Sequence, residues 1–328
     1  MSKKLTICVT RCEEEWKTCS SLFESIALQK GIDFEDIEVI VSNDGIHAIP
    51  DKAYERFPYK VNTITHERVG VSANRNIALD NATGEYVMFC DADDCFLNMY
   101  ALHEILNEAS LGYEMITSCF IEEQPDREKG GWTIFRHDKD ITFIHGKVYN
   151  RQFLIDNDLR FDEELTMHED GYFNVLCDTI ADKKKFITVP LYLWVWNEKS
   201  VIRQYDKDTF LFKTYPQLMK VREKMAEQLE LRGYIDEYIN NVLNTVANSY
   251  YDFQKPVALN PENAELIAEA EKAFKAFYEK FGNVYRECNI NTLSHSLMCA
   301  RLNAFNNGLR VEQQTIREWL THITKEVK

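Results

Sequence analysis

Three carboxylates directly follow a short apolar run, and their spacing favours metal chemistry. The run Tyr86–Cys90 is typical of a buried strand, and it ends in Asp91-Ala92-Asp93-Asp94. Carboxylates this close repel one another unless a cation lies among them. Oxygen ligands suit Mg²⁺ or Mn²⁺, which proteins usually bind through one or two carboxylates together with substrate phosphates. The alternative is an acidic turn before a helix that begins near Phe96, with Asp94 as its N-cap.

A second polar group opens a predicted helix a short distance upstream. Residues 70–76 read Gly-Val-Ser-Ala-Asn-Arg-Asn. An arginine near a helix start can pair with a diphosphate or with a nucleobase carbonyl, because the guanidinium and the helix terminus both favour such acceptors. Arg75 is therefore a candidate ligand-binding residue, and the alternative is an ordinary surface arginine.

A third group, His168-Glu169-Asp170, offers a proton acceptor. Acidic residues at a helix start commonly act as caps, which is one interpretation. The other is a general base that removes a proton from an acceptor hydroxyl, a role that suits a carboxylate beside a metal-diphosphate site. A zinc site is disfavoured because no second histidine follows His168 at helical spacing.

A fourth group follows an aromatic strand-like run. Ser200-Val201-Ile202-Arg203 comes just after Tyr192–Trp196. Arg203 can neutralise a leaving diphosphate, and Trp194 or Trp196 can stack on the apolar face of a sugar. The alternative for the two tryptophans is core packing, since aromatic side chains are usually buried.

Composition limits the class of protein. The chain has 328 residues, 45% of them hydrophobic, so one large or two ordinary domains with a sizeable core are expected. Nine scattered cysteines without a CxxC pair favour a reducing cytoplasm over a zinc knuckle. The net charge of −15 disfavours strong nucleic-acid binding. No run of 18 apolar residues and no signal-peptide pattern occurs, so neither a transmembrane segment nor secretion is expected.

Strand-like and helix-like segments alternate in the first third of the chain, which predicts a mostly parallel, doubly wound α/β sheet. Ligands bind outside the carboxyl ends of the strands in such sheets. Asn43-Asp44 and Asp91-Ala92-Asp93 both fall at strand ends, so we expect them to face one crevice. Strands are expected at 5–10, 37–41, 61–64, 86–90 and 115–121, and helices at 16–27, 71–79 and 101–109.

The pattern becomes less regular after this alternation and is helical towards the end of the chain. Residues 122–131 are polar and contain glycine and proline, which predicts a mobile loop. We place a domain boundary near residue 204, with an α/β domain at 1–204 and a helical domain at 205–328 that binds the acceptor or forms a homo-oligomer. Strands are expected at 141–144, 186–189 and 192–196, and helices at 151–156, 170–180, 210–231, 235–253 and 261–281, with two shorter ones after them.

Taken in order, these motifs resemble the family 2 glycosyltransferases with the GT-A fold. The closest likeness lies in residues 70–94, which include "ANRN" and "TGEYVMFCDADD". Residues 145–174 are also similar to bacterial polysaccharide-type members, with "HGKVYNRQFLIDNDLRFDEEL" leading into "HEDGYFN". The resemblance covers about residues 4–204 and leaves out the helical segment.

The resemblance implies roles for single residues. Asp170, in the pair with Glu169, would be the general base, and Arg203 would stabilise the leaving diphosphate. Asp93 would bind a Mn²⁺ or Mg²⁺ ion, and Asp91 would lie near the ribose or the metal. The residues implied in nucleotide-sugar binding are Thr10, Arg11, Asn43, Asp44, Arg75, Asp91, Lys147 and Trp196.

Two departures from the family pattern lie at the nucleotide end. The first strand ends in Thr10-Arg11-Cys12 in place of a Pro-x-Tyr-Asn-like sequence, and Asn43-Asp44-Gly45 stands in place of Asp-Asp-Gly. Both bear on the base of the donor, which is usually uracil in the family. The metal and general-base positions match the pattern.

The function that follows is a metal-dependent, inverting transfer of a sugar, of the hexosyltransferase type. The donor is a nucleotide-diphosphate sugar, most simply a UDP-sugar, and the acceptor is a hydroxyl group of an unidentified glycan, polymer or protein. A non-catalytic glycan- or protein-binding module on a transferase scaffold is the alternative. A sugar nucleotidyltransferase is a further alternative, but it would need a glycine-rich loop after the first strand, and residues 8–17 contain no glycine.

Overall fold

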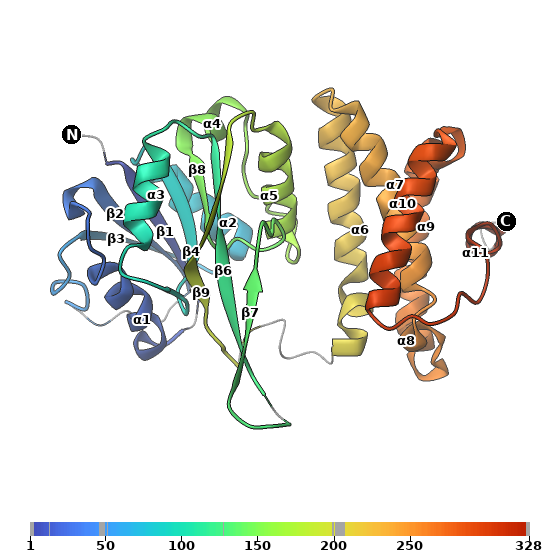
Figure 1. Ribbon diagram of the computed structural model, residues 1–328, viewed down its shortest axis with the longest axis horizontal. Helices are drawn as coiled ribbons and strands as arrows, with labels where there is room; N and C mark the ends of the chain where they lie inside the picture. Colours follow the sequence, from blue (N-terminus) through green and yellow to red (C-terminus); the bar gives the residue numbers. More distant parts are fainter. Residues whose placement is uncertain are drawn as a thin grey trace. The chain divides into compact units, whose positions relative to one another are not determined.

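The chain divides into two compact units, Met1–Glu198 and Lys199–Lys328. The computed structural model describes residues 3–12, 14–45, 50, 52–126, 128–198, 200 and 207–325. The first unit contains a sheet with helices, and the second contains only helices among its described residues (Figure 1). The boundary expected near residue 204 lies outside the described residues.

One mixed sheet forms the framework of the first unit. Its strand order is β3-β2-β1-β4-β8-β6-β9-β5, and β7 pairs with β6. β1, β2, β3 and β4 pair in parallel, while β8 runs antiparallel to both β4 and β6. The expected α/β class is therefore confirmed. The strands are β1 (Leu5–Arg11), β2 (Ile37–Asp44), β3 (Lys60–His66), β4 (Tyr86–Asp91), β5 (Cys95–Phe96), β6 (Met115–Pro125), β7 (Trp132–His137), β8 (Lys147–Asn150) and β9 (Lys184–Trp194).

Helices cover both faces of this sheet because successive strand residues point to opposite faces. Met88 and Cys90 of β4 belong to the core cluster that contains the buried side chains of α1 (Trp16–Ala27) and α3 (Ala101–Ala109). Phe89 lies between them and contacts Phe173 of α5 (Glu169–Ile180), with 6.1 Å between ring centroids. α2 (Val71–Asp80) packs on β1 and β2, and the short α4 (Arg151–Asp156) follows β8.

The structure corrects several local predictions. The expected helix start near Phe96 is wrong, since residues 95–96 form β5 and pair with β9. The predicted loop at 122–131 is wrong in part, because residues 122–125 extend β6 and pair with β7, a strand that was not expected. Residues 141–144 are not a strand. The two strands expected at 186–196 are one strand, β9.

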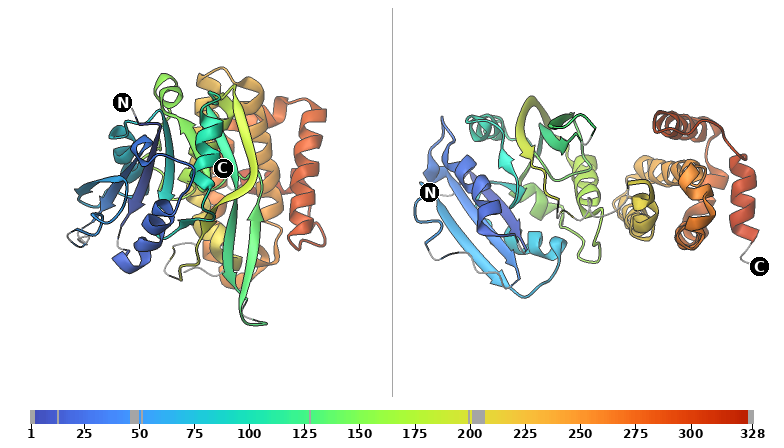
Figure 2. Two further views of the ribbon diagram at one scale, coloured as in Figure 1. Left: turned by 60° about the vertical axis from the view of Figure 1, so that its left-hand side comes forward. Right: turned by 90° about the horizontal axis from the view of Figure 1, so that it is seen from below.

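Six α-helices of very different length build most of the described part of the second unit around its own core. α6 packs against α7 and α9, and α7 packs against α9 and α10, so that these helices lie side by side (Figure 2). Trp319 of α11 is 2% exposed and lies 4.7 Å from Phe274 of α9 between ring centroids. Among the described residues, no helix is both long and apolar enough to cross a membrane. The helices are α6 (Lys207–Leu231), α7 (Ile235–Asp252), α8 (Pro256–Leu259), α9 (Ala264–Glu287), α10 (Ile290–Asn306) and α11 (Ile316–Lys325).

Candidate active site

The carboxyl ends of three parallel strands are neighbours at one edge of the sheet. Thr10 of β1 lies opposite Asp91 of β4, and Arg11 of β1 lies opposite Asn43 of β2. The Thr10 hydroxyl also donates a hydrogen bond to Asp91 Oδ1 at 3.3 Å. The strand-end residues singled out by sequence are therefore brought to the edge where open α/β sheets bind ligands.

A buried arginine joins carboxylates from two distant elements at this edge. Arg75 of α2 is 3% exposed. Its Nη1 donates to Glu169 Oε1 at 2.9 Å and to Asp170 Oδ1, and its Nη2 lies 3.3 Å from Asp91 Oδ1. The aromatic ring of Phe161 covers the guanidinium, with 5.2 Å from Cζ to the ring centroid. One cation thus connects the acidic strand end to the acidic start of α5.

One guanidinium among three carboxylates leaves net negative charge in a buried place, and this determines the pKa values. Burial opposes charge on Arg75, but Asp170, Asp91 and Glu169 outweigh it and raise the pKa of Arg75. Burial also opposes charge on Asp91, yet Arg75 outweighs it, so the pKa of Asp91 is lowered. For Asp170, burial together with Glu169 and Asp91 prevails over Arg75 and raises the pKa to about 8. A carboxylate with such a pKa accepts a proton more readily than an ordinary aspartate.

Asp170 is held in place at the start of α5. Its Oδ2 accepts a hydrogen bond from the backbone N–H of Ile144 at 3.1 Å, while Oδ1 contacts Arg75. Glu169 and Asp170 form the first turn of the helix, where the helix dipole favours carboxylates. His168 before them has φ 62°, a left-handed conformation that is uncommon outside glycine. The two carboxylates therefore begin the helix and also point to Arg75.

Other polar residues of the 70–76 motif fasten the segment that leads to α5. Asn76 Nδ2 donates to the Phe161 carbonyl at 2.9 Å, and Asn76 Oδ1 accepts from the Phe161 N–H at 3.1 Å. Ser72 Oγ donates to the Leu165 carbonyl at 3.0 Å. Sequence reasoning assigned no role to Ser72 or Asn76. The available signal was their spacing, since residues four apart share one helix face.

Asp94 is a structural residue of the strand end. It is 1% exposed, its Oδ2 accepts from the Tyr192 hydroxyl at 2.8 Å, and its Oδ1 accepts from the Val195 N–H at 3.0 Å. The interpretation of Asp94 as a helix cap is wrong, because no helix begins there and the carboxylate instead ties the end of β4 to β9.

The acidic strand end also has the donors for a cation. Asp91, Asp94 and His145 each offer a ligand atom, and these atoms lie within 4.8 Å of one another. Nδ1 of His145 is buried and makes no hydrogen bond with the described residues, although it lies 3.4 Å from Asp94 Oδ2. Asp93 is outside this group and accepts from Asn197 Nδ2 at 2.7 Å. Burial, followed by repulsion from Asp91, raises the pKa of Asp93 to about 6, an effect that a bound cation would reverse.

The residues expected at the nucleotide base are engaged in a tight local network. Arg11 Nη1 donates to Asn43 Oδ1 at 2.5 Å, and Arg11 Nε donates to the Glu14 carbonyl at 3.0 Å. The Asp44 carboxylate accepts from the backbone N–H groups of residues 69–70, at 2.6 and 3.0 Å. These contacts shape the turn before α2. Binding of a nucleotide base by these residues stays a prediction.

Three further residues that were predicted to bind the donor or the leaving diphosphate differ in how deeply they are buried and in what they contact. Lys147 of β8 is fully buried, and its Nζ donates to the His145 carbonyl at 3.1 Å. Burial lowers the pKa of Lys147 to about 8, against the attraction of nearby carboxylates. Trp196 is half-buried, and Arg203 lies outside the described residues. Their roles in donor binding stay predictions.

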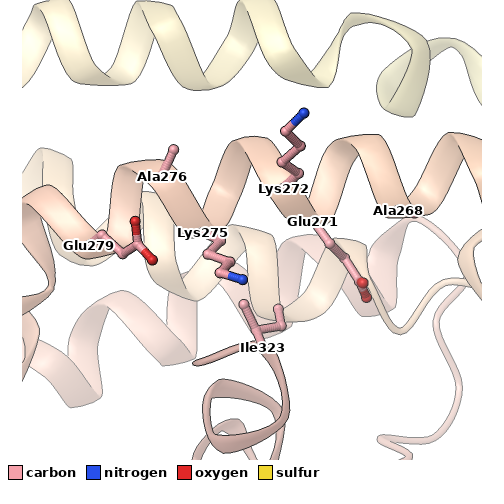
Figure 3. A pocket seen from close by; sticks show the side chains of 7 residues that line it. All are labelled: Ala268, Glu271, Lys272, Lys275, Ala276, Glu279 and Ile323. Carbon is pink, nitrogen blue, oxygen red and sulfur yellow. The ribbon is translucent and has the colours of Figure 1, made fainter. Parts of the chain in front are cut away.

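A surface pocket in the helical unit offers less for chemistry. It has a volume of about 260 Å³ and lies between α9 and α11 (Figure 3). Lys272 and Lys275 line it together with Glu271 and Glu279, while Ile323 of α11 closes one side. These charged side chains are half-buried or exposed, and a mixture of positive and negative charges is typical of a solvated helix face. The strand-end carboxylates of the first unit are the better candidate site.

Comparison with known proteins identifies the family. Residues 6–171 match the family model described as glycosyl transferase family 2. The chain therefore belongs to this family and is a glycosyltransferase. Its fold is of the GT-A type, since it aligns with the crystal structure of residues 1–349 of Staphylococcus aureus TarS with a TM-score of 0.60 and 17% identity over 92% of each chain.

Sequence relatives agree with this assignment. The chain is 25% identical over 306 residues to the Campylobacter jejuni GalNAc(5)-diNAcBac-PP-undecaprenol beta-1,3-glucosyltransferase. This alignment covers 87% of the present chain and 89% of that protein. It is 25% identical over 267 residues to EpsH of Bacillus subtilis, covering 72% and 73%. It is 29% identical over 179 residues to TarS, the poly(ribitol-phosphate) beta-N-acetylglucosaminyltransferase of Staphylococcus aureus, covering 48% of this chain and only 30% of TarS.

Proposed function

We propose that this glycosyltransferase moves a sugar from a nucleotide-diphosphate sugar to an acceptor hydroxyl and inverts the anomeric centre. The observation that carries the proposal is the shared guanidinium of Arg75, which contacts Asp91 at 3.3 Å as well as Asp170. A donor-side carboxylate and a candidate base are thus held at one site, as a single displacement requires.

The chemistry assigns the proton to Asp170. The acceptor oxygen attacks the anomeric carbon from the face opposite the diphosphate, and the bond from that carbon to the diphosphate oxygen breaks. Asp170 takes the acceptor's proton as the new bond forms. This parallels the inverting glycosidases, in which a carboxylate base activates the nucleophile on one face of the sugar ring. No covalent sugar–enzyme intermediate is needed.

The donor set fits a divalent cation, Mn²⁺ or Mg²⁺. We assign Asp93 and Asp91 as its ligands, because Asp91 keeps a 34% exposed side chain at the strand end whereas both oxygens of Asp94 already accept hydrogen bonds within the protein. Once bound, the cation would neutralise charge that develops on the leaving diphosphate. Asp91, Asp94 and His145 form the competing ligand set.

A UDP-linked donor is the simplest choice. TarS has been crystallised with UDP-GlcNAc, and that structure aligns with this chain with a TM-score of 0.56 and 18% identity. We extend this donor to the present chain because the family resemblance implies that Asn43 and Asp44, at the end of β2, lie by the nucleotide base. The sugar and the acceptor remain to be found by screening.

The test is a donor screen that measures released nucleotide diphosphate, run on the native chain and on Asp170→Asn. We expect turnover with a UDP-sugar and, in Asp170→Asn, a loss of about 100-fold or more with UDP affinity kept, because removal of a general base typically costs this much. Asp178→Asn changes a carboxylate on the same helix that pairs with Lys184 at the surface, and should behave like the native chain.

Near-normal turnover by Asp170→Asn would refute the base assignment. UDP binding by the native chain without turnover, across all donors and a broad acceptor panel, would instead favour a glycan- or protein-binding module on this scaffold.

A further inference from the structure

The contacts of Arg75 do not suit a donor ligand, although an arginine in its motif was expected to bind a diphosphate or a base. Its side chain is 3% exposed, and Phe161 covers one side of the guanidinium. Both terminal nitrogens are directed to carboxylates of the protein, Nη1 to Glu169 and Asp170 and Nη2 to Asp91. Both terminal nitrogens of Arg75 are thus occupied by carboxylates of the protein, while its buried Nε makes no hydrogen bond with the described residues.

We propose that Arg75 is a positioning residue: it orients the Asp170 carboxylate towards the acceptor, and it does not bind the donor itself. This inference rests on the proposed function of Asp170 as the base.

Two contacts fix the rotamer of Asp170, one on each oxygen. Oδ2 accepts from the Ile144 N–H at 3.1 Å, and Oδ1 contacts Arg75 Nη1. Without the guanidinium, one oxygen keeps a backbone anchor and the other loses its charged partner. The carboxylate can then rotate about the Ile144 contact. A misplacement of about 1 Å is enough to cost a reaction about 100-fold.

The charges that face Asp170 are mostly negative, so Arg75 is important for its ionisation. Burial, Glu169 beside it on α5 and Asp91 on β4 all raise the pKa of Asp170, and Arg75 on α2 lowers it. Lys147 on β8 is a second cation, but its Nζ donates to the His145 carbonyl. Tyr149 on β8 also faces this site. Removal of Arg75 should therefore raise the pKa of Asp170 further, and raise the pH at which the base becomes active.

The experiment compares Arg75→Gln and Arg75→Lys with the native chain, using the UDP-sugar found by the donor screen. We expect kcat of Arg75→Gln to fall about 100-fold. The acidic limb of its profile of kcat against pH should move to higher pH, and its UDP affinity should stay within about threefold of native. Arg75→Lys keeps a cation but cannot reach three carboxylates, so it should restore part of kcat and bring the acidic limb back towards the native position.

The matched control is Arg160→Gln. Arg160 is half-exposed and forms a paired contact with Asp80 at the end of α2, with Nη1 to Oδ1 at 2.5 Å and Nη2 to Oδ2 at 2.9 Å. Its loss removes an arginine–carboxylate pair on the same helix without touching Asp170, so native kcat and pH dependence are expected.

Two results would overturn the inference. Native kcat and an unmoved acidic limb in Arg75→Gln would exclude a positioning role. A fall in UDP affinity that accounts for the whole loss of kcat/KM would show that Arg75 binds the donor. If Arg75→Gln does not fold, the kcat, the pH profile and the UDP affinity of Arg75→Lys test the inference in the same way. A native chain that transfers no sugar from any donor would instead count against the proposed function, before any variant is compared.

Discussion

Individual carboxylates at the end of β4 differ in what surrounds them, and this decides their roles. The Asp94 carboxylate accepts hydrogen bonds from Tyr192 of β9 and from Val195 just after it, whereas Asp93 contacts the side-chain amide of Asn197. Asp91 shares Arg75 with the start of α5. Residues that look equivalent in sequence thus divide into a structural carboxylate and two that are suited to bind a ligand.

The metal assignment predicts the effect of removing Asp93. Asp93→Ala should weaken Mn²⁺-dependent UDP binding at least about tenfold, because the cation loses one of its proposed ligands. His145→Gln should leave that binding close to native. Isothermal titration with and without EDTA measures both.

The opposite ranking, with His145→Gln the more damaging variant, would mean that Asp91, Asp94 and His145 hold the metal. If EDTA changes neither UDP affinity nor turnover, the chain does not use a metal for donor binding.

Among the elements, α2 is the one that assembles the site. Gly70 at its start has φ 91°, a conformation that favours glycine, and the Asp44 carboxylate accepts from the Gly70 N–H at 3.0 Å. From this start the helix directs Arg75 to the carboxylates and Asn76 to the segment before α5. The helix therefore links the end of β2 to the start of α5.

This arrangement predicts that Asn76 stabilises the fold and the site together. Asn76→Ala removes two hydrogen bonds to the Phe161 backbone from a buried position and leaves those groups unpaired, which should cost about 2–3 kcal/mol of unfolding free energy. It should also lower kcat, because residues 161–165 lead to Asp170. Chemical denaturation and the transfer assay measure the two effects.

The control on the same helix is Asn81→Ala. Asn81 is exposed and its side chain makes one hydrogen bond, to the Ile77 carbonyl, so loss of this side chain should change stability by less than about 0.5 kcal/mol. Equal effects of the two substitutions would contradict the role given to Asn76.

Local pattern predicted some elements well and others poorly, for physical reasons. The bounds of α3 and α4 agree with prediction because apolar residues recur at helical spacing and the flanks break the pattern. The strands expected at 186–189 and 192–196 form one strand, β9, because a shift of register beside Cys119 of β6 accommodates Pro190, which lacks an N–H group. β7 was missed because its pairing with β6, and not its own alternation, makes it a strand.

For the whole molecule, two units with separate cores imply separable stability. Leu22, Phe23 and Ile105 belong to the core of the α/β unit, whereas Phe274 and Trp319 belong to the core of the helical unit. No residue is shared between these two clusters. The described residues of the candidate site all lie in the first unit. Acceptor binding or oligomer formation stays the role that we propose for the helical unit.

Calorimetry of the full chain tests this separation. Trp319→Ala should destabilise the helical unit by about 3–5 kcal/mol and lower only its unfolding transition. UDP with Mn²⁺ should raise only the transition of the α/β unit, because ligand binding stabilises the unit that binds it. Trp132→Ala, at an exposed site on β7, should move neither transition.

A single transition that shifts with both the ligand and Trp319→Ala would contradict separable units.

Periodicity and short motifs are local properties, so they were enough to predict the alternation of strands and helices and the family, and to single out Asp91, Asp93, Glu169 and Asp170 as candidates. The contacts that these residues make with one another come from the fold. Arg75 meets carboxylates from β4 and α5 because the segment before α5 is fastened to α2. Such contacts join residues far apart in the chain, and neither spacing nor charge along the sequence specifies which partner a buried arginine will have.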